Sequence, residues 1–201
     1  EAGTETYPEL AGARVVVTGL STVRGVDLAR AFADRKASLS IQTDERSPEM
    51  VELVALLAST AGDVKLTDFA FSKSTPPTRF AQRAAEDLGG IDAVFNLASV
   101  THAEMAAVET MEEIEDLIVA KLGPLREITE VAANRMALTW SEGTILNAVV
   151  APAPQTDRDA AILGMVRQAL AAMTADLARR WSGDVVRINA IGPKATTLDS
   201  R

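Results

Sequence analysis

Short apolar runs alternate with longer amphipathic segments along almost the whole chain. Runs of strand length occupy residues 15–18, 38–42, 64–66, 93–96, 144–150 and 184–191. Segments with helical spacing of apolar residues separate them, at 27–35, 48–60, 79–88, 105–136 and 159–181. This order predicts a parallel sheet with right-handed crossovers and helices on both faces. We therefore expect a three-layer, doubly wound, Rossmann-like α/β fold with at least six strands.

Two details of the pattern sharpen this picture. Residues 144–150 are almost continuously apolar, which is typical of a strand covered on both faces. The long helical region 105–136 contains Gly123-Pro124, and we expect the helix to be interrupted or kinked there.

Composition places the chain among globular proteins. It has 201 residues, of which 47% are hydrophobic and 24% charged, so a single domain over residues 1–201 is expected. The formal net charge of -8 disfavours binding to nucleic acid and to anionic membranes. No apolar run reaches the ~18 residues of a membrane span. We expect neither nucleic acid nor membrane as a partner.

The chain has no cysteine and one histidine, His102. Disulfides, thiolate metal sites and multi-histidine metal sites are therefore excluded, and we expect no metal. The N-terminal residues lack the basic and apolar segments of a signal peptide. Together these features favour the cytoplasm.

Four segments have an order and spacing that resemble the short-chain dehydrogenase/reductase family. They read ARVVVTGLSTVRG (13–25), DAVFNLAS (92–99), GTILN (143–147) and RINAIGP (187–193). The resemblance covers nearly all of residues 10–198. It implies a Rossmann-type domain that moves hydride to or from NAD or NADP. Family members usually continue through a substrate-covering loop, a helix and a final edge strand. This chain stops at Arg201, so we expect either that the protein is truncated there or that its tail is not included in the sequence.

The glycine loop departs from the family pattern T-G-x-x-x-G-x-G. Gly19 and Gly25 match, whereas Val23 replaces the middle glycine. The outer glycines serve the tight turn and the packing of helix on strand, and the middle one lets the backbone approach the pyrophosphate. A β-branched residue tolerates a positive φ poorly and would put two methyl groups where the cofactor lies. This predicts a packing turn with weak or no dinucleotide affinity.

An alternative interpretation of the same loop keeps some binding. Ser21, Thr22 and the start of the following helix would then donate hydrogen bonds to phosphate. Arg24 would be a salt partner for the phosphate, or else a solvated side chain at the helix start.

On the adenosine side, the resemblance implies an acidic residue at the end of the second strand. Thr43 stands there, and Asp44 follows it. Asp44 is a candidate for holding the ribose hydroxyls, or a simple turn aspartate. Lys65 is aligned with the family's adenine-facing aspartate, and a lysine cannot accept a hydrogen bond.

Two further segments retain part of the family pattern. Asn96 and Ala98 match the family's N-N-A-G after the fourth strand, and we expect Asn96 to tie strands together. Pro193 matches the family's P-G, with Lys194 in place of the glycine. Thr196 or Thr197 is a candidate for the threonine that contacts the nicotinamide carboxamide.

The catalytic tetrad of the family is Asn, Ser, Tyr and Lys. The corresponding residues are Ala120, Val150, Leu163 and Arg167. The only tyrosine is Tyr7, and no lysine lies between Lys121 and Lys194. Arginine does not titrate in the useful range, so no group with a tunable pKa remains at these positions.

Neighbouring residues offer only weak substitutes. His102 follows the fourth strand and has an ordinary pKa suited to proton transfer, although a surface loop histidine is the simpler interpretation. Asp157 and Asp159 are expected to cap a helix. Glu104 and Glu109 are expected to be solvated.

Three hypotheses for function follow. The leading one is a family member without oxidoreductase activity. The second is a divergent NAD(P)-dependent oxidoreductase acting on a carbonyl or hydroxyl group. The third is a scaffold or regulatory subunit that pairs with an active relative. In all three we expect a homodimer or homotetramer through helices 105–136 and 159–181, as in the family, because the second helix is apolar on more than one side. The alternative is a helix covered entirely within the monomer.

Overall fold

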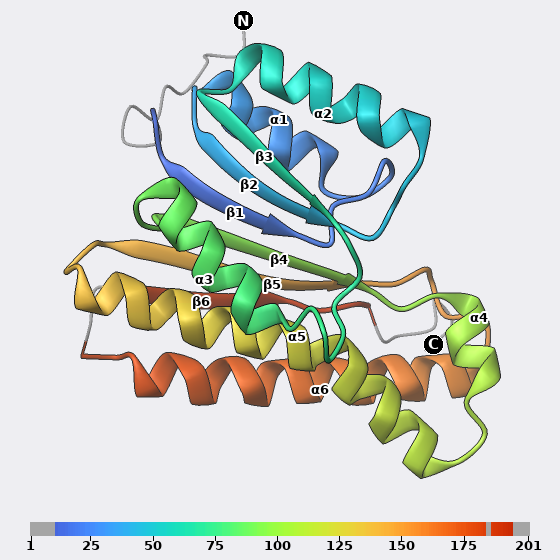
Figure 1. Cartoon of the computed structure of the whole chain (residues 1–201). Coiled ribbons are helices and arrows are strands. Elements are labelled where there is room, and N and C mark those ends of the chain that lie inside the picture. The colour runs from blue at the N-terminus through green and yellow to red at the C-terminus, as the bar shows by residue number, and fades with distance from the viewer. Residues whose placement is uncertain (1–10, 184–185, 195–201) are drawn as a thin grey trace, which may run out of the picture.

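The computed structural model describes residues 11–183 and 186–194. Six parallel strands form one sheet in the order β3-β2-β1-β4-β5-β6 (Figure 1). Their bounds are β1 (Arg14–Thr18), β2 (Ser38–Thr43), β3 (Asp63–Asp68), β4 (Ala93–Ser99), β5 (Gly143–Val150) and β6 (Val186–Ile191). The doubly wound parallel sheet predicted from the sequence is confirmed.

Helices cover both faces of this sheet. They are α1 (Val26–Asp34), α2 (Pro48–Thr60), α3 (Pro77–Leu88), α4 (His102–Ala107), α5 (Met111–Leu138) and α6 (Asp157–Arg180). Val15 and Val17 of β1 pack in the cluster with α1 and α2, whereas Val16 packs with α3 and α5. Alternate residues of one strand thus build two cores, because successive side chains leave a strand on opposite faces.

The strand order reverses between β1 and β4. From β1 the chain adds β2 and β3 on one side, and then crosses to add β4, β5 and β6 on the other. In sheets of this kind, ligands bind at the carboxyl ends of the strands beside the reversal. That edge is where the loop after β1, the ends of β2 and β4, and α5 meet.

The helix is not interrupted at Gly123-Pro124. The break lies at residues 108–110, and α5 begins at a capping box in which Thr110 and Glu113 satisfy each other's N–H groups. The helix then continues through Pro124, which has no N–H to donate to the carbonyl of Ala120. The ribbon of α5 changes direction along its length (Figure 1), as a helix with an internal proline does.

Helix α6 is long and apolar enough to cross a membrane by length and composition alone, with a mean hydropathy of 1.2 over 18 residues. In the fold it packs beside β6 and α5 and buries Leu163, Val166 and Leu170. It thus covers one face of the sheet with one side of the helix. Only 28% of the same window is buried, so the described residues leave much of its surface exposed.

Candidate functional site

A cavity of about 220 Å³ lies at the carboxyl edge of the sheet, between β1 and β4. The loop after β1, the ends of β2 and β4, the segment after β3 and the middle of α5 line it. Among the residues that the sequence singled out, it brings together Gly19, Arg24, Asp44, Ala98 and Ala120.

The two retained glycines serve close packing against β4. Gly19 has a φ of +68°, and a Cβ atom on it would lie 1.9 Å from the carbonyl oxygen of Leu97. Gly25 has a φ of +80°, and its Cβ would lie 2.4 Å from a methyl carbon of the Leu97 side chain. Both positions therefore need glycine for the fold, whether or not a ligand binds.

Between these glycines the loop closes on itself as a tight turn. The N–H of Ser21 donates to the carbonyl of Arg24 at 3.1 Å, and the reverse bond is 3.2 Å. Val23 is 91% exposed at its tip. Outside glycine, the described residues with positive φ are Lys36 and Trp140, so the strain expected at Val23 is absent. Ser21 itself is buried, and its hydroxyl has no hydrogen-bond partner within the described chain.

The donors of Thr22 are already occupied by a carboxylate of the chain. Its N–H donates to Glu45 Oε2 at 2.9 Å, and its hydroxyl to Glu45 Oε1 at 2.8 Å. The Ser47 hydroxyl donates to the same carboxylate at 2.7 Å. The Thr22 N–H, followed by the hydroxyls of Ser47 and Thr22, holds the pKa of Glu45 below its ordinary value. The sequence analysis missed Glu45.

Arg24 is half-buried, which corrects its interpretation as a solvated side chain. Its Nε donates to the carbonyl of Gly19 at 3.2 Å, and the side chain lines the cavity. The guanidinium also acts electrostatically on Glu45. Arg24 therefore folds back over its own loop.

Two adjacent residues at the end of β2, Thr43 and Asp44, differ in burial. Thr43 is buried, and its hydroxyl donates to the carbonyl of Leu20 at 2.7 Å. Asp44 is exposed and lines the cavity, where a hydroxyl-rich ligand could reach it.

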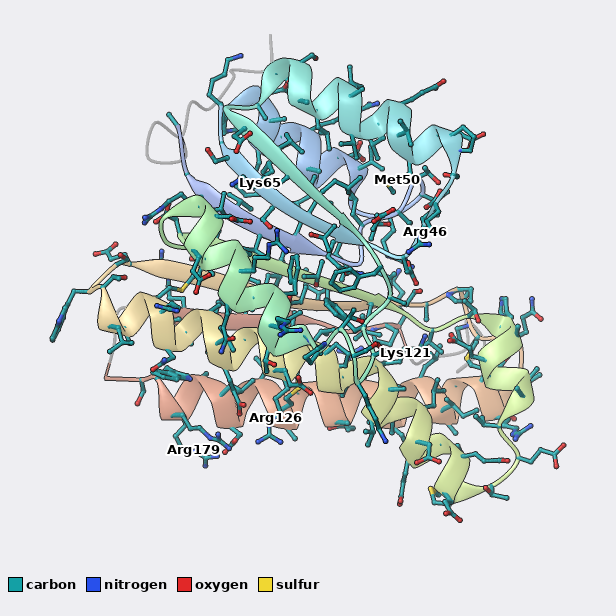
Figure 2. All side chains as sticks on the ribbon, in the orientation of Figure 1. Arg46, Met50, Lys65, Lys121, Arg126 and Arg179 are labelled. Carbon is teal, nitrogen blue, oxygen red and sulfur yellow. The ribbon has the colours of Figure 1, made fainter. Side chains whose placement is uncertain are left out.

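Lys65 does not lie where the alignment with the family put it. It sits within β3, and its ammonium group is 3.7 Å from Asp87 of α3. Figure 2 shows Lys65 well away from Arg46, which lies at the carboxyl edge. The last residue of β3 is Asp68, whose carbonyl accepts two hydrogen bonds from Arg46. Lys65 therefore lies inside the strand and not after it, because β3 is longer than the apolar run that located it.

Asn96 is fully buried at the centre of a polar network, as the sequence predicts. Its amide donates to Asn147 Oδ1 at 2.8 Å and to the Thr129 hydroxyl at 3.3 Å, and its oxygen accepts from the Thr18 hydroxyl at 3.0 Å. The network joins β1, β4, β5 and α5. It holds the strands beside the cavity, which Thr18 of the network also lines.

The four residues that the sequence analysis aligned with the family's tetrad, Ala120, Val150, Leu163 and Arg167, do not form a polar cluster. Leu163 is 0% exposed within an apolar cluster of α4, α5 and α6, and Val150 is 41% exposed at the end of β5. Ala120 is exposed beside the cavity. Arg167 is exposed, and its aliphatic part lies against Gly192. None of these side chains offers a group that exchanges a proton near neutral pH.

The residues considered as substitutes for the catalytic tetrad either form other hydrogen bonds or are exposed. His102 is the first residue of α4 and is exposed. Asp159 accepts from the N–H groups of Gln155 and Thr156, so it caps α6 as expected. Asp157 and Glu109 are exposed. None of these four is among the residues that line the cavity.

Glu104 is not solvated as expected but pairs with Lys121 of α5 at 2.5 Å. Burial acts to raise the pKa of Glu104, but hydrogen bonds from Lys121 and Thr101 outweigh it, so the pKa lies below its ordinary value of 4.5. Figure 2 shows Lys121 near the carboxyl edge, where it also lines the cavity. The pair links α4 to α5.

We expect Lys121→Met to reduce the free energy of unfolding by about 1 kcal/mol near neutral pH, because a partly buried carboxylate loses its partner. The pair stabilises the fold above the ordinary pKa of Glu104, and this contribution disappears as the pH falls through the lowered pKa. Urea unfolding of the wild type and the variant, near neutral pH and at a pH below the lowered pKa of Glu104, measures this difference in the free energy of unfolding. Lys73→Met, in an exposed loop, is the control; an equal effect of the two variants would contradict the prediction.

At the end of β6, Pro193 is buried and Lys194 is exposed. The candidates Thr196 and Thr197 lie outside the described residues.

The residues present do not fit a dinucleotide well. The N–H groups of Gly19, Leu20, Ser21, Thr22 and Arg24 already donate within the chain. The loop thus has few donors left for phosphate. The acceptor that takes two of them, from Thr22, is the carboxylate of Glu45. Among the described residues, no group of three or more His, Asp and Glu side chains could hold a metal.

Comparisons with solved structures show the same fold. A protein of Sinorhizobium meliloti 1021 assigned to the short-chain alcohol dehydrogenases is 25% identical, with a TM-score of 0.73 over 92% of this chain and 72% of that one. A short-chain type dehydrogenase/reductase from Mycobacterium marinum is 19% identical, with a TM-score of 0.72 over 92% and 75%. An NADH-dependent reductase in complex with NAD is 17% identical, with a TM-score of 0.72 over 96% and 82%. No curated protein sequence matches the chain.

A comparison of the sequence with profiles of protein families identifies the family. The profile of the family described as short chain dehydrogenase matches residues 13–200, which is almost the entire chain. This chain therefore belongs to the short-chain dehydrogenase/reductase family.

Proposed function

We propose that this chain is a family member that does not transfer hydride and that binds NAD or NADP weakly or not at all. The observation that carries the proposal is the position of the family's tyrosine, where Leu163 is fully buried in an apolar cluster. A proton donor must reach the reacting group, and a buried aliphatic side chain can neither donate nor accept one. The adjacent positions of the tetrad supply no replacement.

The loop after β1 supports the cofactor part of the proposal. Family members generally bind NAD or NADP through this loop, and here its donors serve the chain itself. Asp44 would remain available for ribose hydroxyls, but a ribose contact alone gives little affinity for a dinucleotide. What this chain retains is the residues that shape the backbone, Gly19, Gly25, Asn96 and Pro193.

Thermal unfolding with NADH and NADPH tests this. A ligand that binds only the native state stabilises it by about 2.7 kcal/mol at a hundredfold excess over its dissociation constant. We expect no shift of Tm at millimolar cofactor. A saturable rise of several degrees with either cofactor would refute the cofactor part.

We further propose that the chain acts in the cytoplasm as a homodimer or homotetramer through α5 and α6. The support is that only 28% of an apolar 18-residue window of α6 is buried by the described residues, together with Val119 of α5, which is 68% exposed. Ala172 of α6 is exposed, and alanine allows another helix to approach closely. A long side chain there should keep the helices apart.

Sedimentation velocity tests the association. We expect the wild type to sediment as a dimer or tetramer and Ala172→Arg to shift it to monomer, because a charged side chain would be buried without a partner. Ala31→Arg, on exposed α1, is the matched control and should leave the assembly unchanged. A monomeric wild type would overturn the proposal.

A further inference from the structure

The carboxylate of Glu45 accepts hydrogen bonds in the way that a bound anion would. Three donors converge on its carboxylate at 2.7–2.9 Å: the N–H and hydroxyl of Thr22, and the hydroxyl of Ser47. Hydrogen bonds to an ionised acceptor are roughly twice as strong as neutral ones. Two of these donors belong to the loop that binds nucleotide phosphate in folds of this kind.

The backbone around Glu45 is fixed as well. Its N–H donates to the Thr43 hydroxyl at 3.0 Å, while Ser47 caps α2 by accepting from the N–H of Met50 at 3.2 Å. The carboxylate is therefore placed by the end of β2 and the start of α2 together. It is not a mobile surface side chain that happens to touch the loop.

The charges nearby favour this internal anion over an external one. Arg24, the cation of the loop, already acts on Glu45. Asp44 is adjacent in sequence, and Asp27 lies in the first turn of α1. A phosphate at Thr22 would have to displace the carboxylate of Glu45.

We infer that Glu45 is the chain's own substitute for a nucleotide phosphate and is the residue that excludes phosphate-bearing nucleotides from the cleft. The inference deepens the proposed function and rests on its claim that dinucleotides bind weakly. It attributes the weak binding of dinucleotides to the side chain of Glu45. Glutamine at this position keeps an acceptor but removes the charge, and alanine also frees both donors of Thr22.

Isothermal titration with NADPH, NADH and inorganic phosphate tests the inference on the wild type, Glu45→Gln and Glu45→Ala. We expect Glu45→Ala to bind NADPH or NADH about tenfold or more tightly than the wild type, with Glu45→Gln in between. Glu49→Gln is the control, since it removes one charge from the exposed first turn of α2 and should leave affinity unchanged. Circular dichroism shows whether each variant is folded.

The possible outcomes separate the two claims. Tight binding of either cofactor by the wild type would overturn both. Weak binding by the wild type with no gain in folded Glu45 variants would overturn the inference and leave the proposed function standing. An equal gain in Glu49→Gln would assign the effect to net charge and overturn the role of Glu45. If Glu45→Ala does not fold, Glu45→Gln decides on the same criterion.

Discussion

Replacing Gly19 by alanine is expected to lower the free energy of unfolding by about 3 kcal/mol or more. The new Cβ would lie 1.9 Å from the carbonyl oxygen of Leu97, which is backbone and cannot swing aside. The positive φ of +68° adds about 1–2 kcal/mol for any residue with a Cβ. Moving β4 to relieve the contact would disturb the network around Asn96.

Gly89→Ala is the matched control for this prediction. Gly89 has almost the same φ, +70°, but nothing lies within 4 Å of its ideal Cβ. Its cost should be only the conformational part, about 1–2 kcal/mol. Urea unfolding gives both values from midpoints at a common slope. Equal losses in the two variants would show that Gly19 serves the turn alone and not the packing on β4.

Leu163→Tyr is expected to lower the free energy of unfolding by roughly 2–6 kcal/mol. Enlarging a fully buried side chain costs about 1–3 kcal/mol, and a buried hydroxyl without a partner costs about 1–3 kcal/mol more. Arg167→Lys, on the exposed side of α6, should change stability by no more than about 0.5 kcal/mol.

The double variant Leu163→Tyr/Arg167→Lys restores the residue types of the family's central pair. We expect it to show no hydride transfer, because the hydroxyl would sit in an apolar cluster and Val150 offers nothing to orient a carbonyl. Absorbance of NADH and NADPH with a set of aldehydes and ketones measures the rate. A stable double variant with activity would mean that the cleft retains more of its catalytic geometry than the buried Leu163 indicates.

The fold could be predicted because its determinants are local. The alternation of apolar runs and amphipathic segments identified every strand, and Gly89 marked the end of α3. The break before α5 was also readable, since Thr110 and Glu113 have the spacing of a capping box. From the sequence, the interruption was expected at Pro124 instead. A proline inside a long helix bends the helix more readily than it ends it.

The site was harder to predict because its decisive contacts are not local. Glu45 and Thr22 are 23 residues apart, and only the pairing of β1 with β2 brings them together. Nothing in the sequence near Glu45 marks it as a ligand of the loop. Lys65 was misplaced for a related reason, because the residue that ends β3 depends on pairing with β2 and not on its own apolar run. The buried state of Leu163 depends on α4 and α5, which are distant in sequence.

The most direct test of the proposed loss of catalysis is hydride transfer by the pure wild-type protein. NADH or NADPH oxidation is followed with a broad set of aldehydes and ketones, and reduction of NAD or NADP with the corresponding alcohols. We expect no rate above that of buffer, in the wild type and in His102→Ala alike. Saturable turnover of any substrate would contradict it, and loss of that turnover in His102→Ala would favour a divergent oxidoreductase that uses this histidine.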